Sequence, residues 1–116
     1  MTWTIWHNPR CTKSRQTLQL LKDHGIEPEI RLYLKETPSM TELNAVLDLL
    51  GIEPRDLMRR KESAYKELNL KNPDLSREAL VGAMAENAGL IERPVVIRDA
   101  AAAAIGRPPE NVLALM

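Results

Sequence analysis

The chain has 116 residues, 44% of them hydrophobic and 28% charged, a composition typical of a soluble globular domain and not of a disordered or fibrous chain. Sixteen basic residues balance sixteen acidic ones, so we expect no nucleic acid and no membrane surface to be held by bulk charge. No apolar stretch approaches the ~20 residues of a spanning helix and no export signal opens the chain, so we expect a cytoplasmic protein.

The first third of the sequence predicts a strand, a helix and a second strand. Residues 2–6 are rich in aromatic and β-branched side chains, which favours a strand, and residues 7–10 are typical of a turn. Residues 11–24 have helical spacing, and Gly25 stands where a left-handed C-cap is expected. Residues 29–34 alternate as a strand does, so we expect one face to carry Ile30, Leu32 and Leu34 and the other to carry Arg31 and Tyr33.

The middle of the chain predicts helices. Ser39 and Glu42 have the spacing of a capping box, and the helix that they begin should end at Gly51. Shorter helices are expected at residues 54–61, where Arg59 and Arg60 would lie, and at residues 63–69. A further helix should run from its N-cap Ser76 to about Asn87.

The last part predicts a strand at residues 94–97, a small edge strand at the end of residues 100–104, and a helix over residues 109–115. The order β-α-β, helices, β-β-α makes the first two strands parallel and the last two a hairpin. That order predicts an α/β fold of the thioredoxin-like kind, with a small mixed four-stranded sheet, in a single domain over residues 1–116.

Cys11 is the residue most suited to chemistry. It is the single cysteine, at the junction of a strand and a helix, where backbone N–H groups and the helix dipole favour negative charge. Arg10, Lys13 and Arg15 add positive charge, and Ser14 could donate a hydrogen bond to the sulfur. These features predict a thiolate nucleophile with a lowered pKa, the alternative being an inert buried cysteine.

Two kinds of cysteine enzyme do not fit this pattern. A phosphatase loop of the form C-x5-R would need arginine where the chain has Thr17, and a dithiol oxidoreductase would need cysteine where it has Ser14. Cys11 can therefore form only an adduct or mixed disulfide, which an external thiol must resolve. The single cysteine excludes a Cys-rich metal cluster, and with only His7 and His24 a zinc site would be hard to fill, so we expect no metal.

Five separated segments together strongly resemble the glutaredoxin-dependent arsenate reductase (ArsC) family, and most closely its short YfgD-like branch. They are His7-Asn8-Pro9-Arg10-Cys11-Thr12-Lys13-Ser14-Arg15, Leu32-Tyr33-Leu34, Leu57-Met58-Arg59-Arg60-Lys61, Glu92-Arg93-Pro94-Val95-Val96 and Gly106-Arg107-Pro108-Pro109-Glu110.

The resemblance implies a function. Cys11 would attack arsenate, and Arg59, Arg93 and Arg107 would hold the oxyanion. Glutathione as cosubstrate and then glutaredoxin as partner would resolve the adduct, with no tightly bound cofactor, and arsenite would leave. Pro94 resembles the cis-proline that stands near the active cysteine of thioredoxin-like proteins.

Three questions stay open at this point. His7 either tunes the thiolate, together with Ser14 and Arg15, or packs at the end of the strand. The chain could instead be an Spx-like redox-responsive RNA polymerase adaptor, although adaptors of that type usually carry a C-x-x-C switch. It could also be a glutathione-linked thiol oxidoreductase with a substrate other than arsenate.

Overall fold

The computed structural model describes residues 2–116, which form two compact units. We call residues 2–36 with 93–116 the sheet unit, and residues 37–92 the helical unit. The helical unit is inserted in sequence between the second and third strands of the sheet unit. A single domain over residues 1–116 stays a prediction.

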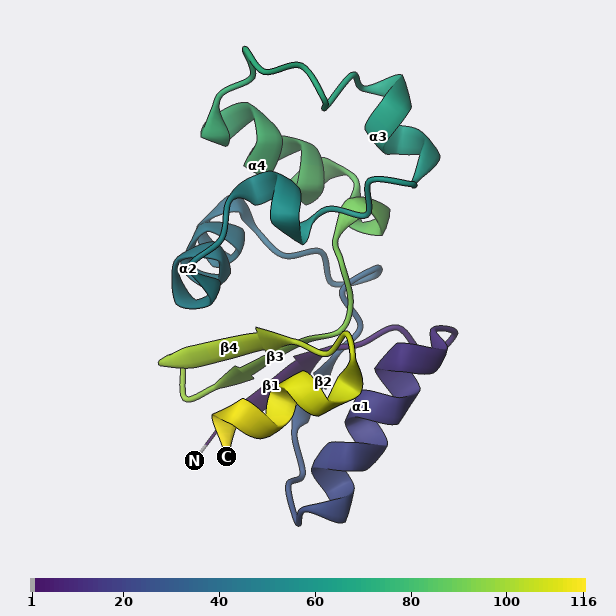
Figure 1. The fold of residues 1–116 in the computed structure, drawn as a ribbon, viewed down its shortest axis with the longest axis vertical. Helices are drawn as coiled ribbons and strands as arrows, with labels where there is room; N and C mark the ends of the chain where they lie inside the picture. The colour runs from purple at the N-terminus through teal and green to yellow at the C-terminus, as the bar shows by residue number, and fades with distance from the viewer. Residues whose placement is uncertain (1) are drawn as a thin grey trace. The chain divides into compact units, whose positions relative to one another are not determined.

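The sheet unit contains the mixed four-stranded sheet that the sequence predicts. Its strand order is β2-β1-β3-β4, with β1 and β2 parallel and the other neighbouring pairs antiparallel. This is the thioredoxin-like arrangement, with the first two strands parallel and the last two a hairpin (Figure 1). The bounds are β1 (Trp3–Trp6), β2 (Glu29–Arg31), β3 (Val95–Arg98) and β4 (Ala102–Ile105).

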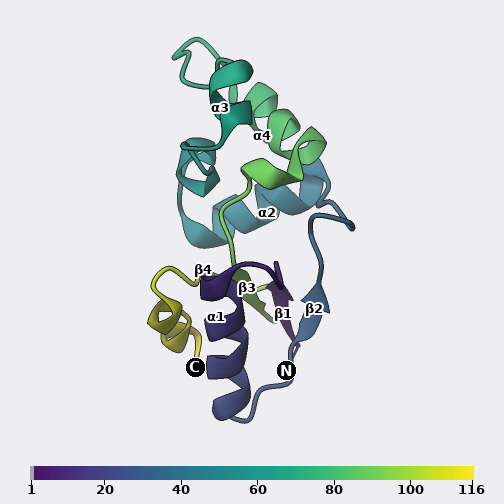
Figure 2. The same cartoon turned by 90° about the vertical axis from the view of Figure 1, so that its right-hand side faces the viewer.

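Helix α1 (Thr12–Asp23) and the 3₁₀ helix η3 (Pro109–Leu115) lie side by side against one face of the sheet (Figures 1 and 2). Gly25 follows α1 with a φ of +77°, which confirms the predicted left-handed residue there. Between the two helices and the sheet lies an apolar core made of Ile5, Leu21, Val96, Val112 and Leu115. Burial of these side chains fixes α1, and with it Cys11, against the central strands.

The predicted strand over residues 29–34 is too long, because β2 ends at Arg31. Tyr33 is only 1% exposed, whereas Ile30 and Leu34 are each 47% exposed. The chain leaves the sheet after Arg31, because the N–H groups of Lys35 and Glu36 turn back to donate to the carbonyl of Leu32. The two-residue alternation of a strand therefore does not continue, and Tyr33 is turned inward.

The helical unit confirms the predicted helices that begin after Ser39 and Ser76, but not the length of the helix expected at residues 54–61. Its elements are α2 (Met40–Leu50), η1 (Pro54–Leu57), α3 (Ser63–Glu67), α4 (Arg77–Glu86) and η2 (Ala88–Leu90). Ser39 and Glu42 form the capping box, Gly51 is left-handed, and the Ser76 hydroxyl accepts from Ala79 N–H. The helix expected at residues 54–61 is a 3₁₀ turn that ends at Leu57. None of the helices among residues 2–116 is long and apolar enough to span a bilayer.

Candidate active site

Cys11 is the N-cap residue of α1, at the end of the loop that follows β1. Its backbone is extended, its N–H donates to Asn8 O at 3.0 Å, and its carbonyl accepts from Arg15 N–H at 3.0 Å. The first N–H groups of a helix have no partner within the helix. The Cys11 side chain makes no capping hydrogen bond, but the N–H groups of Lys13 and Ser14, the second and third helical residues, favour its anionic form electrostatically.

The pKa of the Cys11 thiol lies below its ordinary value, as the sequence predicts. Burial is the largest effect and raises this pKa, because Cys11 is only 8% exposed. The Ser14 backbone N–H, the positive charge of Arg93, the Lys13 backbone N–H and a hydrogen bond from Arg93 lower it further than burial raises it. The surroundings of the buried Cys11 sulfur therefore favour the thiolate over the thiol.

The source of the positive charge differs from the expected one. Arg15 donates to Pro9 O at 2.8 Å and to Thr12 Oγ1 at 3.2 Å, so its guanidinium ties the loop to the helix. The positive charge that lowers the Cys11 pKa belongs to Arg93, and not to Arg10, Lys13 or Arg15. The reason is geometric: in the first turn the backbone N–H groups point toward the N-cap, whereas the side chains radiate away from the helix axis.

Arg93 and Arg107 stand at the end of the β3–β4 hairpin. Val95 pairs with Ile105, so the residues just outside that pair lie side by side, and Gly106 N–H donates to Pro94 O at 2.9 Å. Arg107 Nε donates to Arg93 O at 2.8 Å, and Arg107 Nη2 lies 3.5 Å from Cys11 Sγ. The structure thus brings Cys11, Arg93 and Arg107 together.

Each of these two arginines precedes a proline through a cis peptide bond, Arg93-Pro94 and Arg107-Pro108. A cis bond at Pro94 agrees with the expectation for that position. The second cis bond, at Pro108, was not expected from the sequence.

His7 and Ser14 form a buried pair beside the nucleophile. His7 Nδ1 lies 2.6 Å from Ser14 Oγ, which also accepts from Asn8 N–H at 3.0 Å. The Ser14 hydroxyl was expected to donate to the sulfur, but its side chain faces the loop, and its backbone N–H acts on Cys11 instead. Burial lowers the pKa of His7, and the positive charges of Arg15 and Lys22 lower it further, so the surroundings favour the neutral imidazole.

Arg59 belongs to the helical unit and does not lie on a helix. Its N–H donates to Leu90 O at 2.7 Å, and its guanidinium contacts Glu62 at 3.0 Å and Gly89 O at 3.5 Å. The expected helix ends before Arg59, because the backbone after Leu57 becomes extended and pairs with residues 90–92 instead. The role of Arg59 toward an anion stays a prediction.

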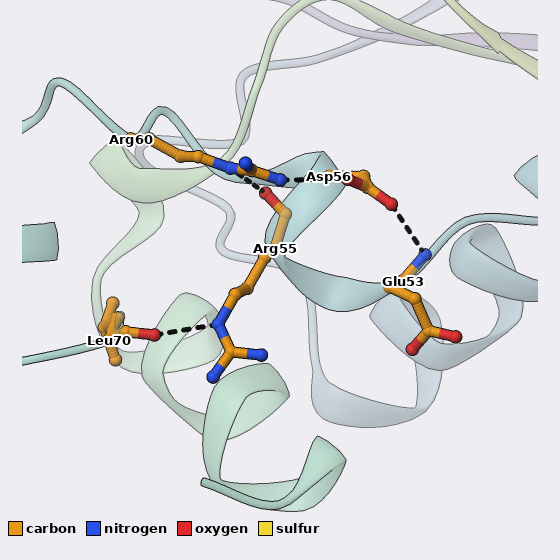
Figure 3. Close-up of polar contacts among 5 residues, drawn as sticks. All are labelled: Glu53, Arg55, Asp56, Arg60 and Leu70. Atoms are coloured by element: carbon orange, nitrogen blue, oxygen red, sulfur yellow. Dashed lines mark hydrogen bonds and ion pairs between the residues drawn. The ribbon is translucent and has the colours of Figure 1, made fainter. Parts of the chain in front are cut away.

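Arg60 contacts Arg55 and Asp56 (Figure 3), which are not the groups that Arg59 contacts. Its Nε donates to Arg55 O at 3.1 Å, and its Nη2 pairs with Asp56 at 2.9 Å. The Arg55 side chain donates in turn to Leu70 O at 2.9 Å and to Asn72 O at 2.6 Å. The side chains of Arg55 and Arg60 therefore both donate hydrogen bonds to backbone carbonyl groups within the helical unit.

Two residues of the Cys11 surroundings were missed from the sequence. Asn8 forms the loop: its Oδ1 accepts from Arg10 N–H at 3.0 Å, and its carbonyl accepts from Cys11 N–H. Gly106 packs so closely that an added Cβ would lie 2.5 Å from Thr17 Oγ1. The turn predicted at residues 7–10 includes Asn8 but does not identify its contact with Cys11, and no local signal marks Gly106, because its neighbours come from elsewhere in the chain.

The arrangement suits nucleophilic attack on an anion. A thiolate is the reactive form of cysteine, and guanidinium groups pair with tetrahedral oxyanions through two parallel hydrogen bonds. Across residues 2–116 no three His, Cys, Asp or Glu side chains gather as metal ligands would.

Known proteins resemble this chain over its full length. The sequence model of the ArsC family matches residues 6–115. An arsenate reductase of Haemophilus influenzae (strain ATCC 51907 / DSM 11121 / KW20 / Rd) is 50% identical over 117 residues, covering 100% of each chain. The uncharacterized protein YfgD of Escherichia coli (strain K12) is 52% identical over 113 residues, covering 97% of this chain and 94% of that protein. The solved structure of an arsenate reductase from Vibrio cholerae has a TM-score of 0.97 at 50% identity, covering 100% of this chain and 98% of that one.

Proposed function

The chain belongs to the ArsC family, and on that premise we propose that it reduces arsenate to arsenite through a covalent adduct on Cys11. The observation that carries the proposal is the Cys11 sulfur 3.5 Å from Arg107 Nη2, with the charge of Arg93 acting on the same atom. The arsenate reductases of Haemophilus influenzae and Vibrio cholerae, each 50% identical to this chain, support arsenate as the substrate.

Binding must overcome repulsion between two anions. Arsenate carries one to two negative charges at neutral pH, and the nucleophile is itself a thiolate. Arg93 and Arg107 offset this repulsion, because their guanidinium groups can hold the arsenate oxygens while the sulfur approaches arsenic. The family resemblance adds Arg59 as a third ligand of the oxyanion.

The reaction proceeds in two chemical steps. The Cys11 thiolate attacks arsenic, a sulfur–arsenic bond forms, and one arsenic–oxygen bond breaks as its oxygen takes up protons and leaves as water. A glutathione thiolate then attacks the Cys11 sulfur, so that a disulfide bond forms and the sulfur–arsenic bond breaks. The electron pair of the broken bond stays on arsenic, which becomes As(III), and two thiols are oxidised to one disulfide.

Regeneration of the nucleophile needs a further thiol, because Cys11 is the single cysteine of the chain. A glutaredoxin thiolate attacks the glutathione sulfur of the mixed disulfide and releases the Cys11 thiolate. The protein needs no tightly bound cofactor for these steps. Ser14, in place of a second cysteine, disfavours the alternative of an RNA polymerase adaptor with a C-x-x-C switch.

Steady-state formation of arsenite by the purified chain, with glutathione and glutaredoxin present, tests the proposal. We expect turnover by the native chain and none by Cys11→Ser. Absence of arsenite with all components present would overturn the proposal. Reduction of a glutathionylated protein without reduction of arsenate would instead favour a thiol oxidoreductase with another substrate.

A further inference from the structure

Thr17 is a fully buried polar residue of α1 for which the proposed reaction has no use. Its Oγ1 donates to Lys13 O at 2.8 Å and lies 3.4 Å from Gly106 O. Valine or leucine would bury the same helical position without a polar group, and threonine inside a helix has a lower propensity than leucine. The hydroxyl therefore calls for an explanation beyond packing.

The first explanation lies in the peptide group that the hydroxyl contacts. The Lys13 carbonyl belongs to the same peptide group as the Ser14 N–H, and that N–H acts on the Cys11 sulfur. A donor on a carbonyl oxygen polarises the whole peptide group, so the N–H on its other side becomes a stronger donor. The Thr17 hydroxyl thus acts on the same peptide group whose N–H favours the Cys11 thiolate.

The second explanation lies in the contact with the β3–β4 hairpin. A Cβ at Gly106 would lie 2.5 Å from Thr17 Oγ1, 2.9 Å from Thr17 Cγ2 and 2.8 Å from Pro94 Cγ. Real Cβ atoms essentially never approach other atoms so closely, so only glycine permits this packing. Gly106 precedes Arg107 and Pro94 follows Arg93, so the contact sets how far α1 stands from both arginines.

We propose that Thr17 and Gly106 form a positioning contact for the nucleophile. The Thr17 hydroxyl fixes the orientation of the Lys13–Ser14 peptide group in the first turn beside Cys11, and the close packing on Gly106 brings Arg93 and Arg107 to the Cys11 sulfur. The consequence for arsenate rests on the proposed function. The effect on the thiolate does not, because alkylation of Cys11 measures it without arsenate.

Thr17→Val and Thr17→Ser form a matched pair for the hydroxyl. Valine keeps the shape and removes the donor, whereas serine keeps the donor and removes a methyl group. The pH profile of Cys11 alkylation by iodoacetamide is the measurement. We expect Thr17→Val to move the midpoint upward and to lower the rate on the acidic limb by about twofold to tenfold, the range for one neutral hydrogen bond. Thr17→Ser should keep the native profile.

Gly106→Ala tests the packing. The added methyl group must push the end of the hairpin from α1, so we expect the midpoint to rise and arsenate reduction to fall at least about tenfold. Gly82→Ala is the matched control, because a Cβ there meets only Met40 side-chain atoms at 3.9 Å, an ordinary contact. Its alkylation profile should be native.

Identical profiles for the native chain, Thr17→Val and Gly106→Ala would overturn the proposal, as would equal shifts in Thr17→Val and Thr17→Ser. Thermal melts show which variants are folded, and Thr17→Ala replaces Thr17→Val if the latter does not fold. A native chain that fails to reduce arsenate would overturn the proposed function alone. The alkylation profiles would still decide whether Thr17 and Gly106 position the nucleophile.

Discussion

The Cys11 sulfur combines two properties that oppose each other, since burial disfavours the very charge that makes a thiol reactive. Groups from two distant parts of the chain offset the rise in the Cys11 pKa that burial causes. Two backbone N–H groups come from the first turn of α1, and the guanidinium charge comes from Arg93 at the end of the β3–β4 hairpin. The nucleophile is therefore a property of the folded sheet unit and not of the loop that carries it.

The first prediction is that Arg93 and not Arg10 maintains the thiolate. The native chain should be alkylated by iodoacetamide with a midpoint below that of a free thiol, and Arg93→Ala should raise that midpoint because its charge and hydrogen bond are lost. Arg10→Ala removes an equal charge from the exposed loop beside Cys11 and is the control. If Arg10→Ala shifted the midpoint as far as Arg93→Ala, the assignment of the charge would be wrong.

The second prediction concerns stability as a function of pH. The pKa of Cys11 is lower in the folded chain than in the unfolded one, so its contribution to stability is present above the unfolded pKa and is lost as pH falls through the folded pKa. The Tm of the native chain minus that of Cys11→Ser should therefore increase as pH rises through this window. Calorimetry over a pH series checks it, and a difference that fell with rising pH would contradict the lowered pKa.

The end of the β3–β4 hairpin places two arginines where β3 begins and β4 ends, and the segment after η1 carries the third expected anion ligand. The third prediction is that Arg93→Ala, Arg107→Ala and Arg59→Ala each lower kcat/KM for arsenate. A hydrogen bond to a charged group contributes about 1.5–3 kcal/mol, so the loss should be roughly 10-fold to 150-fold with little change in Tm.

Arg60→Ala is the control for Arg59→Ala, because its guanidinium is held by Arg55 O and Asp56 on the surface of the helical unit. Its kcat/KM should be within about twofold of the native value, because its guanidinium is engaged by these groups of the helical unit, and the loss of an exposed ion pair should cost only ~0–1 kcal/mol of stability. Equal damage from both variants would remove the reason for assigning Arg59, and not Arg60, to arsenate.

The fourth prediction concerns the end of α2. Gly51 has a φ of +66°, and a Cβ there would meet nothing within 4 Å, so Gly51→Ala changes only the backbone energy. The left-handed conformation costs an L-residue roughly 1–2 kcal/mol, so the free energy of unfolding should fall by about that amount. Gly89 has equally open space without a positive φ, and Gly89→Ala should leave the free energy unchanged within about 0.5 kcal/mol. Urea denaturation measures both, and equal losses would contradict the explanation.

The helix ends were predictable from the sequence because capping is local chemistry. Ser39, Ser76 and Gly51 act within four residues of the helices that they begin or end. The end of β2 was mispredicted because β2 is a short edge strand that a turn ends, and alternation alone carries no information about that end. Arg93 was predicted as a ligand of the substrate. Its effect on the Cys11 pKa was not predicted, because this effect depends on a contact between residues far apart in the sequence.

At the scale of the whole molecule, the net charge is zero, so the chain has no overall field that attracts anions. In the proposed function, recognition of arsenate would therefore depend on the few cations near Cys11, and the reaction would be sensitive to single arginine substitutions. The chain also has only one thiol, because Cys11 is its single cysteine.

The last prediction follows from that single cysteine. Reduction of arsenate to arsenite takes two electrons, and one thiol without a partner supplies only half of a disulfide. Turnover should therefore stop when glutathione is omitted. When glutaredoxin is omitted instead, a mixed disulfide of Cys11 with glutathione should accumulate, visible in the mass of the intact protein and absent from Cys11→Ser. Thioredoxin-coupled reduction ordinarily passes the oxidation through further cysteines of the same chain, and Ser14 stands where the nearest would be. Multiple turnovers supported by thioredoxin alone would thus contradict the mechanism, because the chain has no second thiol with which to release arsenite and form the disulfide that thioredoxin reduces.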